Sequence, residues 1–243
     1  MPPQRPPHPR LRLICLPYLA GGAAAFRGWA EALGPDIEVL PVQLPGRGPR
    51  IREPALTSIP SIVGALATGL SGEFHGSYAL FGYSMGAIVA FELTRLLIRE
   101  RLVPPRHLIV AAHPAPEHAS TNTEIYRLPD EQLVEQLKVF GGMPDQFGDD
   151  AELQSLLLPI MRADMRALET YVYRPGEALR VPITAIGGTD DSQVTDAEIR
   201  AWGGHTLEAF RAISLTGPHF FIHTDPEQLF DVLRPELMPL LAG

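Results

Sequence analysis

The sequence contains very little cysteine, and this limits its chemistry. Cys15 is the only cysteine among 243 residues, so no internal disulfide can form and thiolates cannot build a zinc cluster. It lies in the apolar run 11–16, which favours a buried, unreactive thiol. No pair of histidines has metal-ligand spacing together with a carboxylate. We therefore expect neither a metal site nor a cofactor.

Long apolar runs are also missing. None approaches the ~18 residues of a membrane span, and residues 1–10, rich in proline and arginine, lack the apolar core of a signal peptide. We expect residues 1–10 to form a disordered lead-in and the protein to be cytoplasmic, with no membrane partner. The formal net charge of −8 disfavours binding to nucleic acid, which requires a basic field.

Short apolar segments alternate with helical patterns along the rest of the chain. This alternation predicts an α/β fold over residues 11–243, as one domain with a mostly parallel central sheet and helices on both faces. The strands are expected at 11–16, 37–44, 78–81, 107–111, 182–186 and 210–215, and the helices between them at 23–33, 58–70 and from the residues after Ser84 to about Arg101.

The alternation breaks between residues 112 and 181, a segment several times longer than one crossover helix needs. It contains helical patterns at 130–140 and 151–173, with the turn Gly141–Pro144 between them. We expect an insertion over approximately 114–175 that forms a lid above the carboxyl ends of the strands. A plain additional helical layer is the alternative.

Gly82-Tyr-Ser-Met-Gly86 follows an apolar strand pattern and precedes a helical one. This context predicts a nucleophile elbow, in which Ser84 is exposed at a sharp turn. Side chains at positions 82 and 86 would collide with the flanking strand and helix, so both must be glycine. A tight structural turn is the alternative reading.

A serine hydroxyl needs a histidine to take its proton and a carboxylate to orient that histidine. Such an elbow within an alternating α/β pattern predicts the α/β-hydrolase fold, in which the acid and the histidine follow the serine in that order, each after a late strand. Asp190 and Asp191 follow one predicted strand, and His219 follows the last. Taken singly, the aspartates could be turn formers and His219 a packed side chain, but their order along the chain favours a triad. His113 and His118 are weaker candidates for lining a pocket.

The glycine-rich loop 17–22 follows the first predicted strand. It lacks the Gly-Lys-Ser/Thr ending of a phosphate-binding loop and the spaced glycines of a dinucleotide site. Its better use is to bring a backbone N–H close to the elbow, where it helps to bind an oxyanion.

Together these motifs resemble type II thioesterases, the free-standing proofreading hydrolases of polyketide and nonribosomal peptide synthases. The resemblance extends from Leu13 to the carboxyl end and depends on segments 16–22, 26–29, 43–50, 82–92, 158–164, 169–171, 187–191 and 218–221.

The resemblance implies a role for each matching residue. Ser84 would be the nucleophile, His219 the general base and Asp191 the acid, with Asp190 as the fallback. The oxyanion donors would be the backbone N–H groups of Leu19 and Met85.

Some positions depart from the family pattern, which leaves the pocket size and the acyl preference open. They include Leu19, Ala20 and Tyr83. We expect Ala20, Tyr83 and Phe220 to contact the substrate.

The function implied is hydrolysis of acyl thioesters on the phosphopantetheine arm of acyl or peptidyl carrier domains, which removes aberrant acyl groups from a synthase. A general carboxylesterase and a non-catalytic binding protein of the same fold are the alternatives. Carrier domains are typically acidic, so a surface patch of Arg47, Arg50 and Arg52 would favour their docking. The sequence leaves the oligomeric state open.

Overall fold

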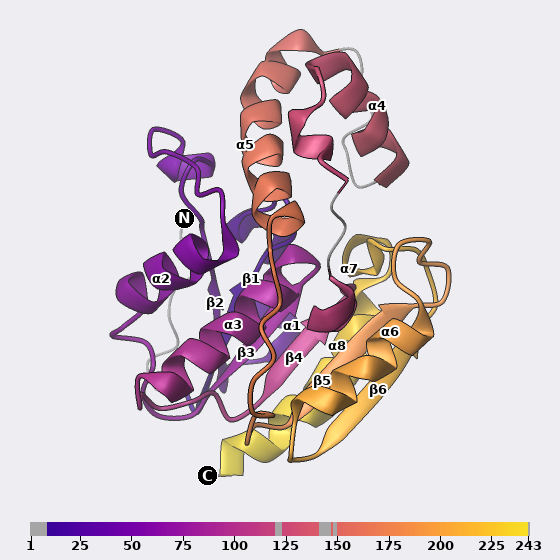
Figure 1. The fold of residues 1–243 in the computed structure, drawn as a ribbon. Helices are drawn as coiled ribbons and strands as arrows, with labels where there is room; N and C mark the ends of the chain where they lie inside the picture. Colours follow the sequence, from indigo (N-terminus) through magenta and orange to yellow (C-terminus); the bar gives the residue numbers. More distant parts are fainter. Residues whose placement is uncertain (1–8, 120–122, 141–146, 148–149, 243) are drawn as a thin grey trace.

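The computed structural model describes residues 9–119, 123–140, 147 and 150–242 (Figure 1). Most of the expected lead-in and the turn Gly141–Pro144 lie outside these residues. The strands are β1 (Leu11–Leu16), β2 (Ile37–Pro41), β3 (Tyr78–Tyr83), β4 (Leu108–Ala111), β5 (Ile183–Gly188) and β6 (Phe210–Leu215). The α-helices are α1 (Trp29–Leu33), α2 (Ile59–Gly69), α3 (Met85–Arg99), α4 (Asp130–Phe140), α5 (Ala151–Glu169), α6 (Asp196–Ala201), α7 (Phe221–Thr224) and α8 (Pro226–Leu237).

The six strands form one sheet in the order β2-β1-β3-β4-β5-β6, and every neighbouring pair is parallel. Successive side chains of β1 point to opposite faces. Ile14 and Leu16 join a core with α2, α3 and α6, whereas Leu13 and Cys15 join a core with α1 and α8. The prediction of a parallel sheet covered on both faces is therefore confirmed, and Cys15 is buried as expected.

Several predicted boundaries were wrong. The helix expected at 23–33 is two pieces, a 3-10 helix at Ala23–Phe26 and α1, because Gly28 between them adopts a φ of +84°. β2 ends at Pro41, where 44 was expected, and α5 ends at Glu169, where 173 was expected. The elbow helix α3 ends at Arg99, close to the predicted end.

Helices α4 and α5 stand together beyond one end of the sheet (Figure 1). They share an apolar cluster that includes Leu133, Leu137, Met161 and Met165. Arg162 on α5 binds the backbone carbonyl of Leu128 and the carboxylate of Asp130, which ties the two helices together. We call residues 123–169, as far as the structure describes them, the helical insertion. Among all the helices described, none is both long enough and apolar enough to cross a bilayer.

The turn between β3 and α3 is sterically tight. Ser84 adopts φ 51° and ψ −119°, a conformation that non-glycine residues rarely take. A Cβ on Gly82 would lie 2.2 Å from the carbonyl oxygen of Gly86, and a Cβ on Gly86 would lie 2.2 Å from that of Leu16. Both obstacles are backbone atoms, so no side-chain rotation can relieve the clash. These contacts show why both positions require glycine.

We predict that Gly86→Ala lowers the free energy of unfolding by about 3 kcal/mol or more, because strand β1 and helix α3 must move apart. Urea unfolding measures this change. Gly64→Ala is the matched control, since a Cβ on Gly64 in α2 would meet no atom within 4 Å. It should stabilise the protein by about 0.5–1 kcal/mol. An unfolding free energy of Gly86→Ala equal to that of the unaltered protein would contradict the steric argument.

Candidate active site

Ser84 lies at the carboxyl end of β3, at the apex of the tight turn. Its N–H donates to the carbonyl of Ala111 at 2.8 Å, which extends the β3–β4 ladder to the turn itself. Its Oγ lies 3.3 Å from Nε2 of His219, within hydrogen-bond distance. The turn thus presents the hydroxyl to an imidazole that comes from a loop 135 residues further along the chain.

Asp191 lies on the other side of the same imidazole. Its Oδ2 is 2.8 Å from Nδ1 of His219, and its side chain is fully buried. Its Oδ1 accepts hydrogen bonds from the N–H groups of Gln193 at 2.8 Å and Val194 at 3.2 Å. With both oxygens engaged, the carboxylate has a fixed direction and holds the imidazole with Nε2 toward Ser84.

The side chain of Asp190, in contrast to that of Asp191, does not bond to His219. It is exposed, and its carboxylate accepts a hydrogen bond from the Thr189 hydroxyl at 3.2 Å. Its backbone N–H donates to the carbonyl of Gly217, and that of Thr189 donates to Leu215. These two backbone bonds join the loop after β5 to the loop after β6, which brings Asp191 beside His219. Between the two aspartates, the geometry favours Asp191 as the partner of the histidine.

Tyr83 forms hydrogen bonds with the backbone of the segment that carries His219. Its hydroxyl donates to the backbone carbonyl of His219 at 2.5 Å and accepts a hydrogen bond from the N–H of Ile222. Burial raises the pKa of Tyr83 well above its usual value, so the hydroxyl keeps its proton. The side chain is fully buried under the site. The sequence suggested a substrate contact for Tyr83, and the structure instead gives it a bond to the histidine loop.

The sequence assigned two backbone N–H groups, those of Met85 and Leu19, to the oxyanion site. Met85 is the first residue of α3, so its N–H has no acceptor in a preceding helical turn. Leu19 belongs to the loop after β1, which runs along the same end of the sheet and lines the same cavity as Ser84. Ala20, which follows it, has a φ of 58° and donates its N–H to Asp164 on α5 at 2.7 Å.

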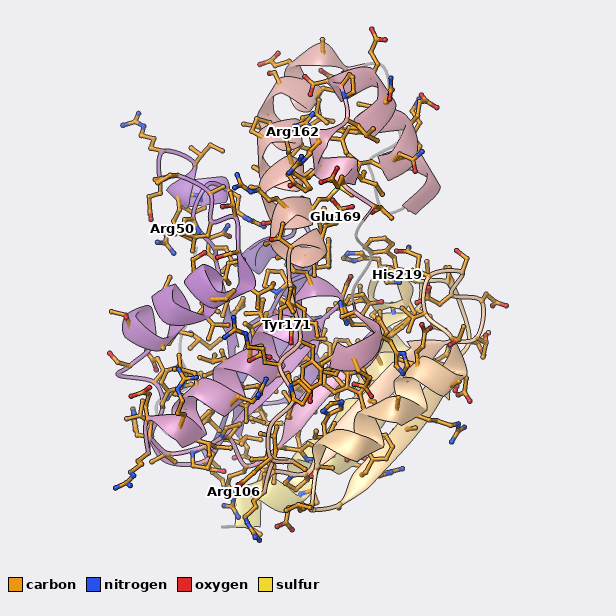
Figure 2. All side chains as sticks on the ribbon, in the orientation of Figure 1. Arg50, Arg106, Arg162, Glu169, Tyr171 and His219 are labelled. Atoms are coloured by element: carbon orange, nitrogen blue, oxygen red, sulfur yellow. The ribbon has the colours of Figure 1, made fainter. Side chains whose placement is uncertain are left out.

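A cavity of about 460 Å³ opens beside Ser84 and His219, between the sheet and the helical insertion. Figure 2 shows Glu169 at the foot of α5, above the region in which His219 lies. The insertion contributes an apolar wall of Ile125, Leu137, Met165 and Leu168. Other lining residues include Tyr18, Leu19, His113, His118, Ser192, Gln193, Glu198 and Phe220.

A second hollow, of about 800 Å³, lies over α2 and α3. It contains neither Ser84 nor His219 among the residues that line it.

His113 lies in the cavity wall but is almost completely buried. Its pKa is lowered from 6.5 to about 4, mainly because burial disfavours the charged imidazolium; a hydrogen bond to the carbonyl of Pro114 opposes this shift, and proximity to His219 adds to it. Its backbone carbonyl accepts a hydrogen bond from Trp202 at 2.9 Å. His113 therefore contributes a neutral imidazole to the wall at physiological pH.

Residues 11–237 match the family of thioesterase domains. The chain belongs to the thioesterase family. It is 36% identical to the gramicidin S biosynthesis protein GrsT of Aneurinibacillus migulanus, over 96% of this chain and 91% of GrsT.

Solved structures show the same relationship. RedJ, a thioesterase from the prodiginine biosynthetic pathway in Streptomyces coelicolor, superposes with a TM-score of 0.90 at 38% identity, over 96% of this chain and 92% of RedJ. BorB, the type II thioesterase from the borrelidin biosynthetic cluster, superposes with a TM-score of 0.87 at 39% identity, over 97% and 95%. The expected resemblance to type II thioesterases and the α/β-hydrolase fold are thereby confirmed, and the activity class is thioester hydrolysis.

The remaining sequence expectations about the site have mixed outcomes. Phe220, His113 and His118 line the cavity, whereas Ala20 is not among the described residues that line it and packs against the core of the insertion. Arg47 was expected in a basic surface patch, and this is wrong. Its side chain is only 5% exposed and forms an ion pair with Asp164.

Sequence reasoning missed Tyr18 and Glu169. Tyr18 lines the cavity and packs edge-to-face on Phe220 with ring centroids 5.3 Å apart. Glu169 accepts hydrogen bonds from the N–H groups of Ile125 and Tyr126, which positions part of the cavity wall. Both residues lie inside segments that carry the family resemblance, and that was the only sequence signal for them.

We predict that Tyr83→Phe lowers thioesterase kcat about tenfold and costs on the order of 1–2 kcal/mol in unfolding free energy, because the carbonyl of His219 loses its donor. Tyr78→Phe is the matched control, since Tyr78 begins the same strand and its hydroxyl donates to the carbonyl of Val103, away from the site. Tyr78→Phe should lower the unfolding free energy by a similar amount and leave kcat unchanged. Equal kcat in the two variants would contradict the positioning role of Tyr83.

A second prediction concerns pH and His113. As the pH falls below 6.5, the unfolded chain protonates this histidine while the folded protein resists until about pH 4. Unfolding free energy should therefore fall through this window, by about 1–2 kcal/mol between pH 6.5 and 5 from this residue. Urea unfolding at both pH values measures the loss.

His113→Gln should remove that part of the pH dependence, while His75→Gln, at an exposed site, should leave it unchanged. If the loss between pH 6.5 and 5 is the same in all three proteins, the burial of His113 does not oppose its protonation.

Proposed function

We propose that this thioesterase hydrolyses acyl groups from the phosphopantetheine arm of acyl or peptidyl carrier domains in a polyketide or nonribosomal peptide synthase. The observation that carries the proposal is the continuous contact from Asp191 through His219 to Ser84, at 2.8 and 3.3 Å, beside a cavity with an apolar wall. The biosynthetic origin of GrsT, RedJ and BorB supports the choice of carrier-bound substrates.

The first half of the reaction acylates the serine. Nε2 of His219 takes the proton as Ser84 Oγ attacks the thioester carbonyl, and Asp191 stabilises the imidazolium that forms. The N–H groups of Leu19 and Met85 bind the resulting oxyanion. When the tetrahedral intermediate collapses, the C–S bond breaks, the imidazolium of His219 gives its proton to the sulfur, and the thiol of the arm leaves. A thiol has a pKa of about 8.5, so it needs less protonation by His219 than an amine would.

The second half releases the acid. A water molecule gives its proton to Nε2 of His219 and attacks the ester carbonyl on Ser84. The same N–H groups bind the second oxyanion, and the proton returns to Ser84 Oγ as the free carboxylic acid leaves. Each group is used twice, so the cycle requires only one histidine and one pair of donors.

The helical insertion serves as the lid in this proposal. Its apolar wall of Ile125, Leu137, Met165 and Leu168 faces the acyl chain and excludes water from the side opposite the sheet. A carrier domain brings the arm to the mouth of the cavity. Tyr18 and Phe220, which pack on each other, lie near the thioester end because they belong to the loops that carry Leu19 and His219.

Hydrolysis of an acyl-loaded carrier domain and of the matching oxygen ester tests this function. The unaltered protein should prefer the thioester, and Ser84→Ala should abolish turnover. Asp191→Asn should reduce kcat by a factor on the order of 10³–10⁴, because the imidazole then loses the partner that fixes its tautomer.

Asp190→Asn is the matched control for this experiment, since Asp190 is adjacent, exposed and bonded away from the histidine. It should change kcat by less than a factor of about two. Faster turnover of the oxygen ester would identify a general carboxylesterase. A loss of kcat in Asp190→Asn as large as that in Asp191→Asn would refute the assignment of the acid.

A further inference from the structure

A buried ion pair joins the helical insertion to the body of the fold. Arg47, in the loop after β2, donates from Nη1 to Oδ2 and from Nη2 to Oδ1 of Asp164 on α5, both at 2.7 Å. The two side chains are 5% and 0% exposed. Taking two charges out of water is costly, and the mutual attraction offsets this cost only when further hydrogen bonds satisfy both groups.

The further hydrogen bonds of the pair go to one loop. Oδ2 of Asp164 accepts the backbone N–H of Ala20 at 2.7 Å, and Nη1 of Arg47 donates to the carbonyl of Gly21 at 3.2 Å. The pair therefore holds an N–H and a C=O of neighbouring residues. Both lie directly after Leu19, whose N–H is one of the two oxyanion donors in the proposed function.

This loop needs such support. Ala20 has a φ of 58°, in the left-handed region that a residue with a Cβ avoids unless its surroundings impose it. Gln43 holds the next part of the loop, since its Oε1 accepts the N–H of Ala23 at 3.0 Å and its Nε2 donates to the carbonyl of Arg47 at 3.2 Å. Arg47 and the loop are thus parts of one hydrogen-bonded unit.

The partner on α5 is next to the cavity wall. Met165 follows Asp164 directly and Leu168 lies one turn further on, and both line the cavity. A shift of α5 would move the wall and the carboxylate together. An apolar pair of similar volume could hold α5 in place equally well, but it could not bond to Ala20 and Gly21.

We propose that Asp164 and Arg47 are positioning residues for the oxyanion site: they fix the backbone after Leu19 and so couple the position of α5 to the direction of the Leu19 N–H. This inference rests on the proposed function, in which Leu19 binds the oxyanion. It assigns the ion pair a role in transition-state stabilisation in addition to any role in folding.

Two double variants separate these roles. The first, which we call the leucine variant, combines Arg47→Met with Asp164→Leu and removes both charges and the acceptor for the N–H of Ala20. The second, the asparagine variant, combines Arg47→Met with Asp164→Asn. It also removes both charges, but an amide oxygen remains to accept the hydrogen bond from the N–H of Ala20. Neither leaves a buried charge without a partner. The control is Arg12→Met with Glu38→Gln, which removes a largely buried ion pair between β1 and β2, together with the contacts of Arg12 to Glu73, all outside residues 18–22.

The first readout is turnover of a short-chain acyl N-acetylcysteamine thioester, with inhibition by an alkyl boronic acid that forms a tetrahedral adduct on Ser84. The leucine variant should lose a factor of about 10²–10³ in kcat with little change in KM, and a similar factor in boronate affinity. The asparagine variant should recover most of the lost kcat and most of the lost boronate affinity. In the control, both quantities should stay within about twofold of those of the unaltered protein.

A leucine variant with unchanged kcat and boronate affinity would overturn the inference, as would a loss shared equally by the control. Amide hydrogen exchange across residues 18–22 is independent of activity. It should be faster in the leucine variant than in the asparagine variant, and equal rates would also overturn the inference. If the unaltered protein hydrolyses no thioester, the proposed function fails, whereas the exchange comparison still decides whether the pair holds the loop.

Discussion

The steric contact between β3, α3 and the end of β1 is the constraint on which the rest of the site depends. At Gly82 and Gly86 the backbones approach so closely that a methyl group would meet a carbonyl oxygen at 2.2 Å. This approach forces Ser84 into an unfavourable conformation and places its hydroxyl beyond the sheet. Because the obstacles are main-chain atoms of three buried elements, packing of the whole core maintains the position of one hydroxyl.

The parallel sheet supplies the remaining groups. Since every strand runs in the same direction, the loops after β1, β5 and β6 all emerge at the end where Ser84 lies. Short local bonds then refine this arrangement, such as the bond from Tyr83 to the carbonyl of His219. The ion pair between Arg47 and Asp164 likewise fixes the relative positions of the loop after β1, the loop after β2 and the insertion. Topology thus brings the groups together, and buried polar contacts determine their directions.

Most of the fold could be predicted from the sequence, because buried parallel strands are short apolar runs whose pattern is local. The order of Ser84, Asp191 and His219 was readable for the same reason, since each follows such a run. The helix boundary at Gly28 was missed because the φ of a glycine depends on tertiary context. Arg47 was misplaced because a guanidinium is normally exposed, and its buried partner lies 117 residues away.

The separation of Arg47 and Asp164 along the chain has a consequence for recombination between related genes. A crossover within the intervening segment takes the two residues from different parents. If the second parent has an uncharged residue at either position, the chimaera buries one charge without its counterion, at a cost of about 3–5 kcal/mol. With such a parent, the insertion cannot be exchanged by itself, and the loop after β2 must come from the same parent as the insertion.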